Sequence, residues 1–276
     1  MANMRVVYDN AADRCASLVA SSTAGTLAVS NLQNDLKSQV WRSTSNTSIL
    51  TLTWTSAEQI SCVALPFTNL TASATIRVKL YTETADVTPV LDTGNVFACP
   101  SSQGYQADLD VPLGVNYFAY GGYSYADIFF AATSAKKIEV ILINTGASGY
   151  VEAARLVVGK YWSPANNVEN ESPKVAIQED SKHERADSGD LHTDRGPMYR
   201  KLTFDLGLMT SSDRNYVWRI LRGNGMSKPV YLNLIPDSTD VFDESIHSVF
   251  GKLASNSAIQ YKLMGQYATS LQFEEL

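Results

Sequence analysis

The chain has 276 residues, of which 45% are hydrophobic and 18% are charged, and its formal net charge is −6. This apolar content excludes a chain that is disordered throughout, because disorder requires low hydrophobicity and high charge. The acidic balance provides no electrostatic basis for binding nucleic acid or an anionic membrane surface. No window approaches the roughly 18 consecutive apolar residues of a membrane-spanning helix. The length suits two domains or one large β domain.

The N-terminus and the cysteines bear on the compartment in which the protein folds. Residues 1–9 contain one basic residue and no long apolar run, so we expect no secretory signal peptide and folding in a cytoplasm. The three cysteines, Cys15, Cys62 and Cys99, are far apart and odd in number. This spacing favours buried free thiols over a disulfide framework or a zinc site.

Strand patterns dominate the first 160 residues. Residues 49–54 and 74–81 alternate between apolar and polar side chains, and residues 59–65 and 138–143 are nearly continuous apolar runs. Residues 153–158 form a further short strand candidate. Many short strands with almost no helical pattern indicate a β-sandwich or jelly roll. The apolar members of the two alternating strands, together with a nearby tryptophan, are the predicted core: Trp41, Leu50, Leu52, Trp54, Ile76, Val78 and Leu80.

The composition changes between residues 162 and 197, where charged residues accumulate and aromatic residues are absent until Tyr199. This stretch is either a disordered connector or a solvated β-hairpin that turns at residues 186–189. Val175 and Ile177 alternate with polar neighbours, and residues 199–206 continue as a strand. We favour a long hairpin that opens a second domain, which gives predicted domains of 1–165 and 166–276.

The second domain contains the clearest helix pattern of the sequence, over about residues 211–222. Thr210 and Asp213 have the spacing of a capping box, and Gly223 is placed to end the helix in the left-handed conformation. Apolar residues 216, 217, 220 and 221 share one face. Residues 229–236 form a strand bounded by prolines, and residues 259–273 form one or two further strands.

Catalytic and metal-binding motifs are missing from the sequence. The histidines, His183, His192 and His247, have no ligand partners at suitable spacing apart from the loose set of Asp243 and Glu244 beside His247. Residues 237–240 lack the order of a calcium loop, and residues 223–228 follow a helix, which indicates a turn and not a phosphate loop. We therefore expect no enzyme, no metal and no cofactor.

An aromatic segment at residues 117–130 contains seven aromatic side chains around a Gly-Gly pair. Tyrosine combines apolar area with a polar tip, which suits a protein interface or stacking on sugar rings. The alternative is that these tyrosines only cover the edge of a sheet. The candidate interface or glycan-binding residues are Tyr117, Tyr120, Tyr123 and Tyr125.

Several stretches of the sequence have counterparts in one known class of proteins. Asn31-Leu32 followed by Val40-Trp41-Arg42-Ser43 is similar to the opening of a galactose-binding (discoidin-like) jelly roll in distal-tail-like proteins, which belong to the tail tip and baseplate of tailed bacteriophages. Residues 154–164 resemble the exit strand of the same module, with Ala154 in place of the usual glycine. Residues 196–202, 228–236 and 250–253, with the acidic C-terminus, look like the second domain.

This resemblance covers nearly the whole chain and implies a virion structural protein. It implies a mainly β fold, a jelly-roll β-sandwich followed by a smaller β-rich domain with one helix. The expected partners are further copies of the chain in a ring and other tail proteins, namely the tube, hub and tape measure. Assembly would take place in the host cytoplasm, and the mature location would be the virion. The alternative is a carbohydrate-binding module that recognises host surface glycans, although many such jelly rolls have no sugar site.

Overall fold

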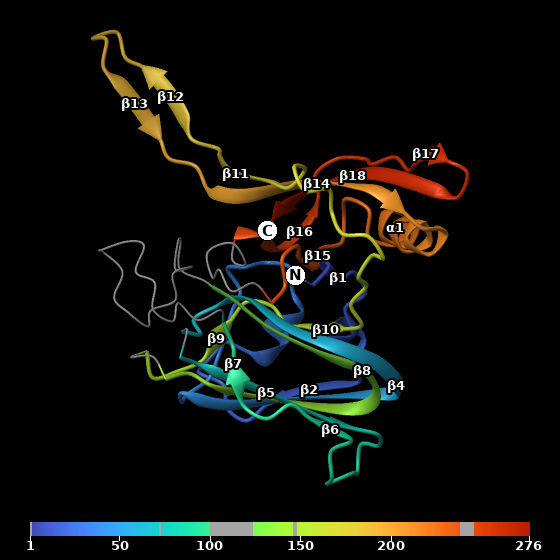
Figure 1. Ribbon diagram of the computed structural model, residues 1–276. Helices are drawn as coiled ribbons and strands as arrows, with labels where there is room; N and C mark the ends of the chain where they lie inside the picture. Colours follow the sequence, from blue (N-terminus) through green and yellow to red (C-terminus); the bar gives the residue numbers. More distant parts are fainter. Residues whose placement is uncertain (1, 72, 100–123, 146–147, 238–245) are drawn as a thin grey trace. The chain divides into compact units, whose positions relative to one another are not determined.

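The computed structural model describes residues 2–71, 73–99, 124–145, 148–237 and 246–276 of the chain (Figure 1). These residues form two compact units. The first unit contains residues 1–163 and 230–248, and the second contains residues 164–229 and 249–276. The predicted fold class, a mainly β jelly-roll sandwich followed by a smaller β-rich domain with one helix, is confirmed.

Two long paired strands form the centre of the sheet in the first unit. Strand β4 (Thr47–Thr68) pairs antiparallel with β8 (Ser124–Ile143), with register shifts between Thr53 and Glu58 and between Ile60 and Cys62. The sequence predicted separate strands at 49–54 and 59–65. They are one strand because residues 55–58 contain no glycine or proline to end it, and β-bulges let a strand bend without breaking.

Shorter strands complete the nine-stranded sheet of the first unit, in the order β3-β9-β4-β8-β5-β6, with β2 and β10 on β4 and β7 on β5. Because β4 and β8 bend, side chains from both halves of each strand face one core, which is the arrangement of a sandwich. The short strands are β2 (Ser17–Ala20), β3 (Trp41–Arg42), β5 (Thr75–Tyr81), β6 (Leu91–Asp92), β7 (Val96–Phe97), β9 (Glu152–Ala153) and β10 (Val157–Gly159).

All seven predicted core residues lie in this core, with at most 3% of each side chain exposed. The Trp54 indole Nε1 also donates a hydrogen bond to the Ala11 carbonyl at 2.9 Å, so the ring is satisfied as well as buried. The cysteines form no disulfide; Cys62 and Cys99 are buried, as predicted, whereas Cys15 is half-buried.

The first unit also includes a strand from late in the chain. Strand β15 (Val230–Asn233) pairs antiparallel with β1 (Arg5–Val7), and the Tyr231 hydroxyl donates to Asp127 of β8 at 2.5 Å. The predicted domain of 166–276 therefore differs from the structure at residues 230–248. Pairing between strands more than 220 residues apart leaves no local pattern in a sequence.

The second unit is built on β14 (Met198–Met209), which lies between β11 (Lys174–Glu179) and β18 (Gln266–Glu275). Strands β16 (Ser248–Leu253) and β17 (Gln260–Leu263) both pair with β18. Leu202, Phe204, Leu271 and Phe273 face the same side of this sheet and are buried. The Phe204 and Phe273 rings stack with centroids 6.0 Å apart.

A hairpin continues beyond β11 and β14. Strands β12 (Lys182–Arg185) and β13 (Leu191–Asp194) pair with each other in a separate two-stranded sheet, and the chain turns at residues 186–189, as predicted. Gly189 has a φ of +90°, which strongly favours glycine at that position. Residues 180–195 are called the arm below. The structure thus favours the hairpin over a disordered connector.

Helix α1 (Ser211–Gly223) begins at the predicted capping box, in which Thr210 and Asp213 exchange hydrogen bonds. Val217 and Ile220 are buried on its inner face. The predicted ending at Gly223 is wrong in detail: the C-cap is Asn224 in the right-handed region, and the left-handed residue is Gly225, with a φ of +50°. The helix extends one residue further than predicted because Asn224 N still donates to Ile220 O.

Candidate interaction surfaces

Of the four candidate tyrosines, Tyr117, Tyr120 and Tyr123 lie outside the described residues. Tyr125 is 8% exposed and belongs to the packing of the first unit. Its ring lies 5.4 Å from that of Phe67 and 6.3 Å from that of Tyr231, measured between centroids. Little of the Tyr125 ring is therefore left to contact a glycan or another protein.

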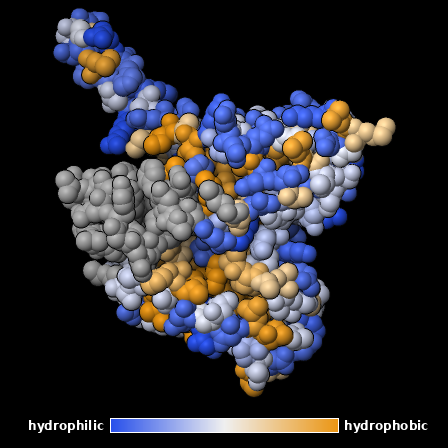
Figure 2. All heavy atoms as spheres, viewed as in Figure 1, coloured by the Kyte–Doolittle hydropathy of each residue, from blue (hydrophilic) through white to orange (hydrophobic). Residues whose placement is uncertain are grey.

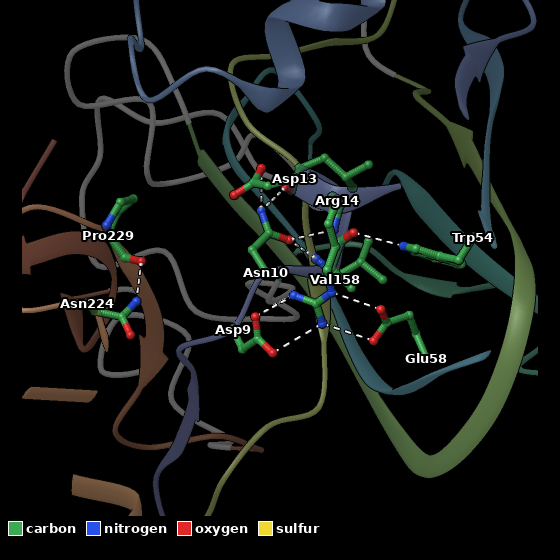
Figure 3. Close-up of polar contacts among 12 residues, drawn as sticks. Asp9, Asn10, Asp13, Arg14, Trp54, Glu58, Val158, Asn224 and Pro229 are labelled. Carbon is green, nitrogen blue, oxygen red and sulfur yellow. Dashed lines mark hydrogen bonds and ion pairs between the residues drawn. The ribbon is translucent and has the colours of Figure 1, made fainter. Parts of the chain in front are cut away.

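Charged side chains near the start of the chain form one cluster, drawn in Figure 3. Arg14 donates two hydrogen bonds to Glu58, at 2.8 and 2.9 Å, and two more to Asp9. The hydrogen bonds to Glu58 raise the pKa of Arg14 above its usual value. Both carboxylates are held by the same guanidinium, so the cluster links the segment before the sandwich to β4 and does not present a free acid–base pair.

The two sequence pieces at residues 31–43 and 154–164 meet in the structure. Leu156 N and Arg155 Nη1 both donate to the carbonyl of Leu32, at 3.0 and 3.1 Å. Arg155 is 4% exposed and its guanidinium also lies 2.8 Å from Asp13. The motif arginine therefore has a structural role in closing the sandwich.

The glycine of the exit piece is also explained by packing. A Cβ atom on Gly159 would lie 2.6 Å from the Asp9 carbonyl oxygen, so only glycine allows this close approach. Asn10 fixes the same region, because its Oδ1 accepts from the backbone of Val158 (Figure 3). Its Nδ2 also donates to Leu156 O. These contacts show that residues 154–164 have a structural role in the fold of the first unit.

The acidic C-terminus is held within the second unit. Glu275 accepts from Arg200 Nε at 3.0 Å, and Glu274 lies 2.9 Å from Lys201 Nζ. Both glutamates lie on β18 and both basic residues on β14, so the pairs cross between neighbouring strands. Cross-strand pairs of opposite charge stabilise a sheet modestly.

The segment at 223–228 is a turn, as the sequence predicted. Ser227 N and Lys228 N both donate to the Asn224 carbonyl, and the Asn224 side chain reaches Pro229 O (Figure 3). This arrangement uses the backbone amides within the turn itself. A phosphate loop would need those amides to point outward at an anion.

The histidines are not brought together around a metal. His183 and His192 both lie on the arm, where His183 Nδ1 is 3.0 Å from Thr193 Oγ1. Asp243 and Glu244 lie outside the described residues. Within the described ranges, no group of three or more His, Cys, Asp and Glu side chains is placed to hold a metal ion. Nor is any helix of this part of the chain long and apolar enough to cross a membrane.

One edge of the sandwich carries an aromatic ring beside a charged group. The Arg42 guanidinium lies 4.3 Å from the centroid of the Tyr150 ring and donates to Glu152. Asn69 and Asn144 hold the Tyr150 carbonyl at 3.1 and 3.0 Å. The two amides thereby fix the backbone of the loop that carries the Tyr150 ring beside Arg42.

The arm is almost fully exposed to solvent. Every residue of β12 and β13 is exposed, including Leu191 at 55%. At the base of the arm, Ile177 is 74% and Met198 is 49% exposed. Figure 2 shows the surface of the arm as mainly hydrophilic, with an apolar area near its end. Two-stranded hairpins of this kind are marginally stable alone.

No protein-family model matches the sequence, and no curated protein matches it. Among solved structures, about half of the chain is similar to carbohydrate-binding modules. The CBM32 module of AlyQ, in complex with 4,5-unsaturated mannuronic acid, is 15% identical over 52% of this chain and 94% of that chain, with a TM-score of 0.36.

Two further carbohydrate-binding modules are similar to about the same share of this chain. A chitosan-binding module from a chitosanase/glucanase of Paenibacillus sp. IK-5 is 18% identical over 55% of this chain and 99% of that chain, with a TM-score of 0.37. A CBM32 module of Clostridium perfringens, in complex with GalNAc-β-1,3-galactose, is 12% identical over 52% of this chain and 94% of that chain, with a TM-score of 0.35. Likeness at this level does not transfer sugar binding to the chain.

Proposed function

We propose that this chain is a non-catalytic structural protein that assembles with further copies of itself, using the arm as a contact. The observation that carries the proposal is the exposure of every residue of β12 and β13. A hairpin that buries almost none of its own surface gains little stability from its own chain. A neighbouring protein supplies the missing burial.

The setting of this assembly is the tail tip or baseplate of a tailed bacteriophage. The resemblance of residues 31–43 and 154–164 to the jelly roll of distal-tail-like proteins supports this setting. In it, copies of the chain form a ring that contacts the tail tube, hub and tape measure, and the ring is assembled in the host cytoplasm before it becomes part of the virion. The polar clusters support a structural role, because their charged groups are engaged in holding the fold.

The proposal is tested by measuring the native mass of the full chain and of an arm-shortened chain. Asp180 N donates to Pro197 O at 3.1 Å, so an Asn-Gly turn can replace residues 181–196 without separating β11 from β14. We expect the full chain to form a particle of several copies by light scattering and the shortened chain to be monomeric. Normal assembly of the shortened chain would contradict a role for the arm.

Point variants provide a matched control for this deletion. Leu191 on the arm and Val87 in the first unit are both exposed aliphatic residues, at 55% and 90%. We expect Leu191→Asn to weaken assembly at least tenfold and Val87→Asn to leave it unchanged. Equal effects of the two variants would show that general surface polarity, and not the arm, controls association.

A second candidate function is recognition of a glycan by the first unit. The Tyr150 ring beside the Arg42 guanidinium, on a loop whose backbone Asn69 and Asn144 hold in place, favours it. The similar solved structures include modules with bound sugars. Isothermal titration with alginate-, chitosan- and galactose-type oligosaccharides tests this candidate. Glycan recognition requires saturable binding that is lost in Tyr150→Ala. The absence of binding heat with every sugar would exclude this candidate function.

A further inference from the structure

The outer face of α1 places an exposed tryptophan among three arginines. Trp218 is 58% exposed although the opposite face of the helix is buried. Arg214 and Arg222 lie four residues before and after Trp218, so they are its neighbours on the helix surface, and Arg219 follows it directly. No ion pair in the described part of the chain involves Arg219 or Arg222. Tryptophan and arginine are the residue types enriched at the energetic centres of protein interfaces.

This surface continues onto the neighbouring hairpin of the same unit. Arg214 donates to the Tyr267 hydroxyl at 2.7 Å, and the Tyr267 ring packs at 4.9 Å against that of Tyr261 on β17. Tyr261 is 75% exposed, and Leu263 and Met264 beyond it are also exposed. The patch named here comprises Trp218, Arg214, Arg219, Arg222, Tyr261, Leu263 and Met264.

The arm has the opposite charge. Residues 180–195 contain five carboxylates against three Lys and Arg side chains, a net charge of −2 with histidine neutral. Its outer part, residues 186–194, carries Asp187, Asp190 and Asp194 with no Lys or Arg. Leu191 lies among these carboxylates and is more than half exposed. The arm therefore offers an apolar side chain surrounded by negative charge, and the patch offers an aromatic surface surrounded by positive charge.

We propose that the outer part of the arm of one copy binds the patch of a second copy, head to tail. This inference rests on the proposed function, because it names the partner surface for the arm. The arm and the patch are two different surfaces of the second unit, so each copy offers both halves of the contact. Repetition of such a heterologous contact produces a ring when the rotation between copies closes and a filament when it does not.

Charge reversal tests the pairing directly. Arg219→Glu/Arg222→Glu makes the patch acidic like the arm, and Asp187→Lys/Asp190→Lys makes the arm basic like the patch. Each variant alone then repels itself, and we expect each to lose at least 90% of the assembled fraction by light scattering. Mixed in equal amounts, the two variants can alternate, and opposite charges then meet at each contact between them, so we expect assembly to return.

Two controls separate lost contact from lost folding. Combining all four reversals in one chain restores complementary charges, so we expect this variant to assemble. Lys160→Glu reverses an exposed charge in the first unit and is expected to assemble as the unaltered chain does. Far-ultraviolet circular dichroism of every variant reports whether the fold is retained.

The outcomes distinguish this inference from the proposed function. Recovery of assembly on mixing supports the head-to-tail pairing. If the unaltered chain assembles and both reversed variants assemble equally well, or if the mixture stays monomeric, the pairing is wrong and the proposed function stands. If the unaltered chain is monomeric at all concentrations tested, the proposed function fails and the pairing fails with it.

Discussion

The pair β4–β8 in the first unit and the pair β12–β13 in the arm use the same antiparallel hydrogen-bonding pattern with opposite consequences for burial. The β4–β8 pair supplies core residues from both of its halves, and several of them are fully buried. The β12–β13 pair has four exposed residues in each strand. Because hydrogen bonds alone contribute modestly to stability, burial makes the difference.

This contrast indicates what each region is for. The first unit has its own core, so its stability comes from within the chain. The arm obtains no comparable burial from its own chain, and its outer part contains three aspartates and no Lys or Arg. Charged side chains on exposed strands discourage unspecific pairing with other chains.

The largest expected effect separates two tryptophans. Trp54 is 3% exposed in the core of the first unit, and Trp218 is 58% exposed on α1. Trp54→Ala is expected to cost about 3–5 kcal/mol of unfolding free energy, because it opens a cavity and removes a buried ring. Trp218→Ala is expected to change it by less than about 0.5 kcal/mol. Urea unfolding of both variants measures these changes. Equal losses of unfolding free energy in the two variants would contradict the prediction.

The second prediction concerns the buried hydroxyl of Tyr231, which donates to Asp127. Tyr231→Phe removes one of the hydrogen-bond donors to the Asp127 carboxylate. We expect it to lower the free energy of unfolding by about 1–3 kcal/mol. Desolvation already raises the pKa of Asp127, and the Tyr231 hydrogen bond opposes this rise. A carboxyl with a raised pKa in the folded protein lowers stability as the pH rises through that pKa. Removing the Tyr231 donor raises the pKa further, so the free energy of unfolding lost by the variant should be larger at pH 7 than at pH 4.

Urea unfolding of the Tyr231→Phe variant at these two pH values checks the sign. A loss that is larger at pH 4 would show that the ionised carboxylate does not depend on this donor. Tyr161→Phe serves as a control for the removal of a tyrosine hydroxyl elsewhere in the same unit. Its ring lies edge-on to Phe129, and the substitution keeps that contact.

The third prediction addresses the start of α1. Thr210→Ala removes the side-chain half of the capping box and is expected to cost about 1 kcal/mol. Ser211→Ala, one residue later, removes a hydroxyl without removing the cap. Amide hydrogen exchange of α1 reports the local stability, and we expect faster exchange only for Thr210→Ala. The same rate in both variants would contradict the importance of the cap.

The smallest expected effect lies on the exposed edge of the first unit. Hydrogen bonds from Arg77 lower the pKa of Asp92 from 3.8 to about 2. A lowered carboxyl pKa adds stability above the unfolded value, and this contribution is lost as pH falls from about 4 through about 2. In Arg77→Met, an NMR titration of the Asp92 carboxyl should return the pKa towards 3.8. An unchanged pKa would rule out Arg77 as the cause.

Local patterns in the sequence predicted much of the fold correctly. Alternation identified the core residues of β4 and β5, and the Thr210–Asp213 spacing identified the start of α1. The turn at residues 186–189 followed from its glycine and polar composition. These features depend on neighbours within a few residues, which is the range that periodicity and capping rules describe.

Features that depend on distant contacts were not predictable in the same way. The pairing of β15 with β1 and the Tyr231–Asp127 hydrogen bond join residues more than 100 positions apart. The patch around Trp218 was also missed, although a tryptophan opposite Val217 and Ile220 on the helix was a usable signal. Of the four tyrosines proposed as an interaction site, Tyr125 packs inside the first unit.

The central claim, that the arm is covered only when copies associate, is tested most directly by hydrogen exchange. Amide exchange of residues 180–195 is measured at a protein concentration that favours monomers and at one that favours the assembled particle. We predict that arm amides exchange at least tenfold more slowly in the particle, while β4 and β8 amides are unchanged. Identical arm exchange in monomer and particle would contradict the claim.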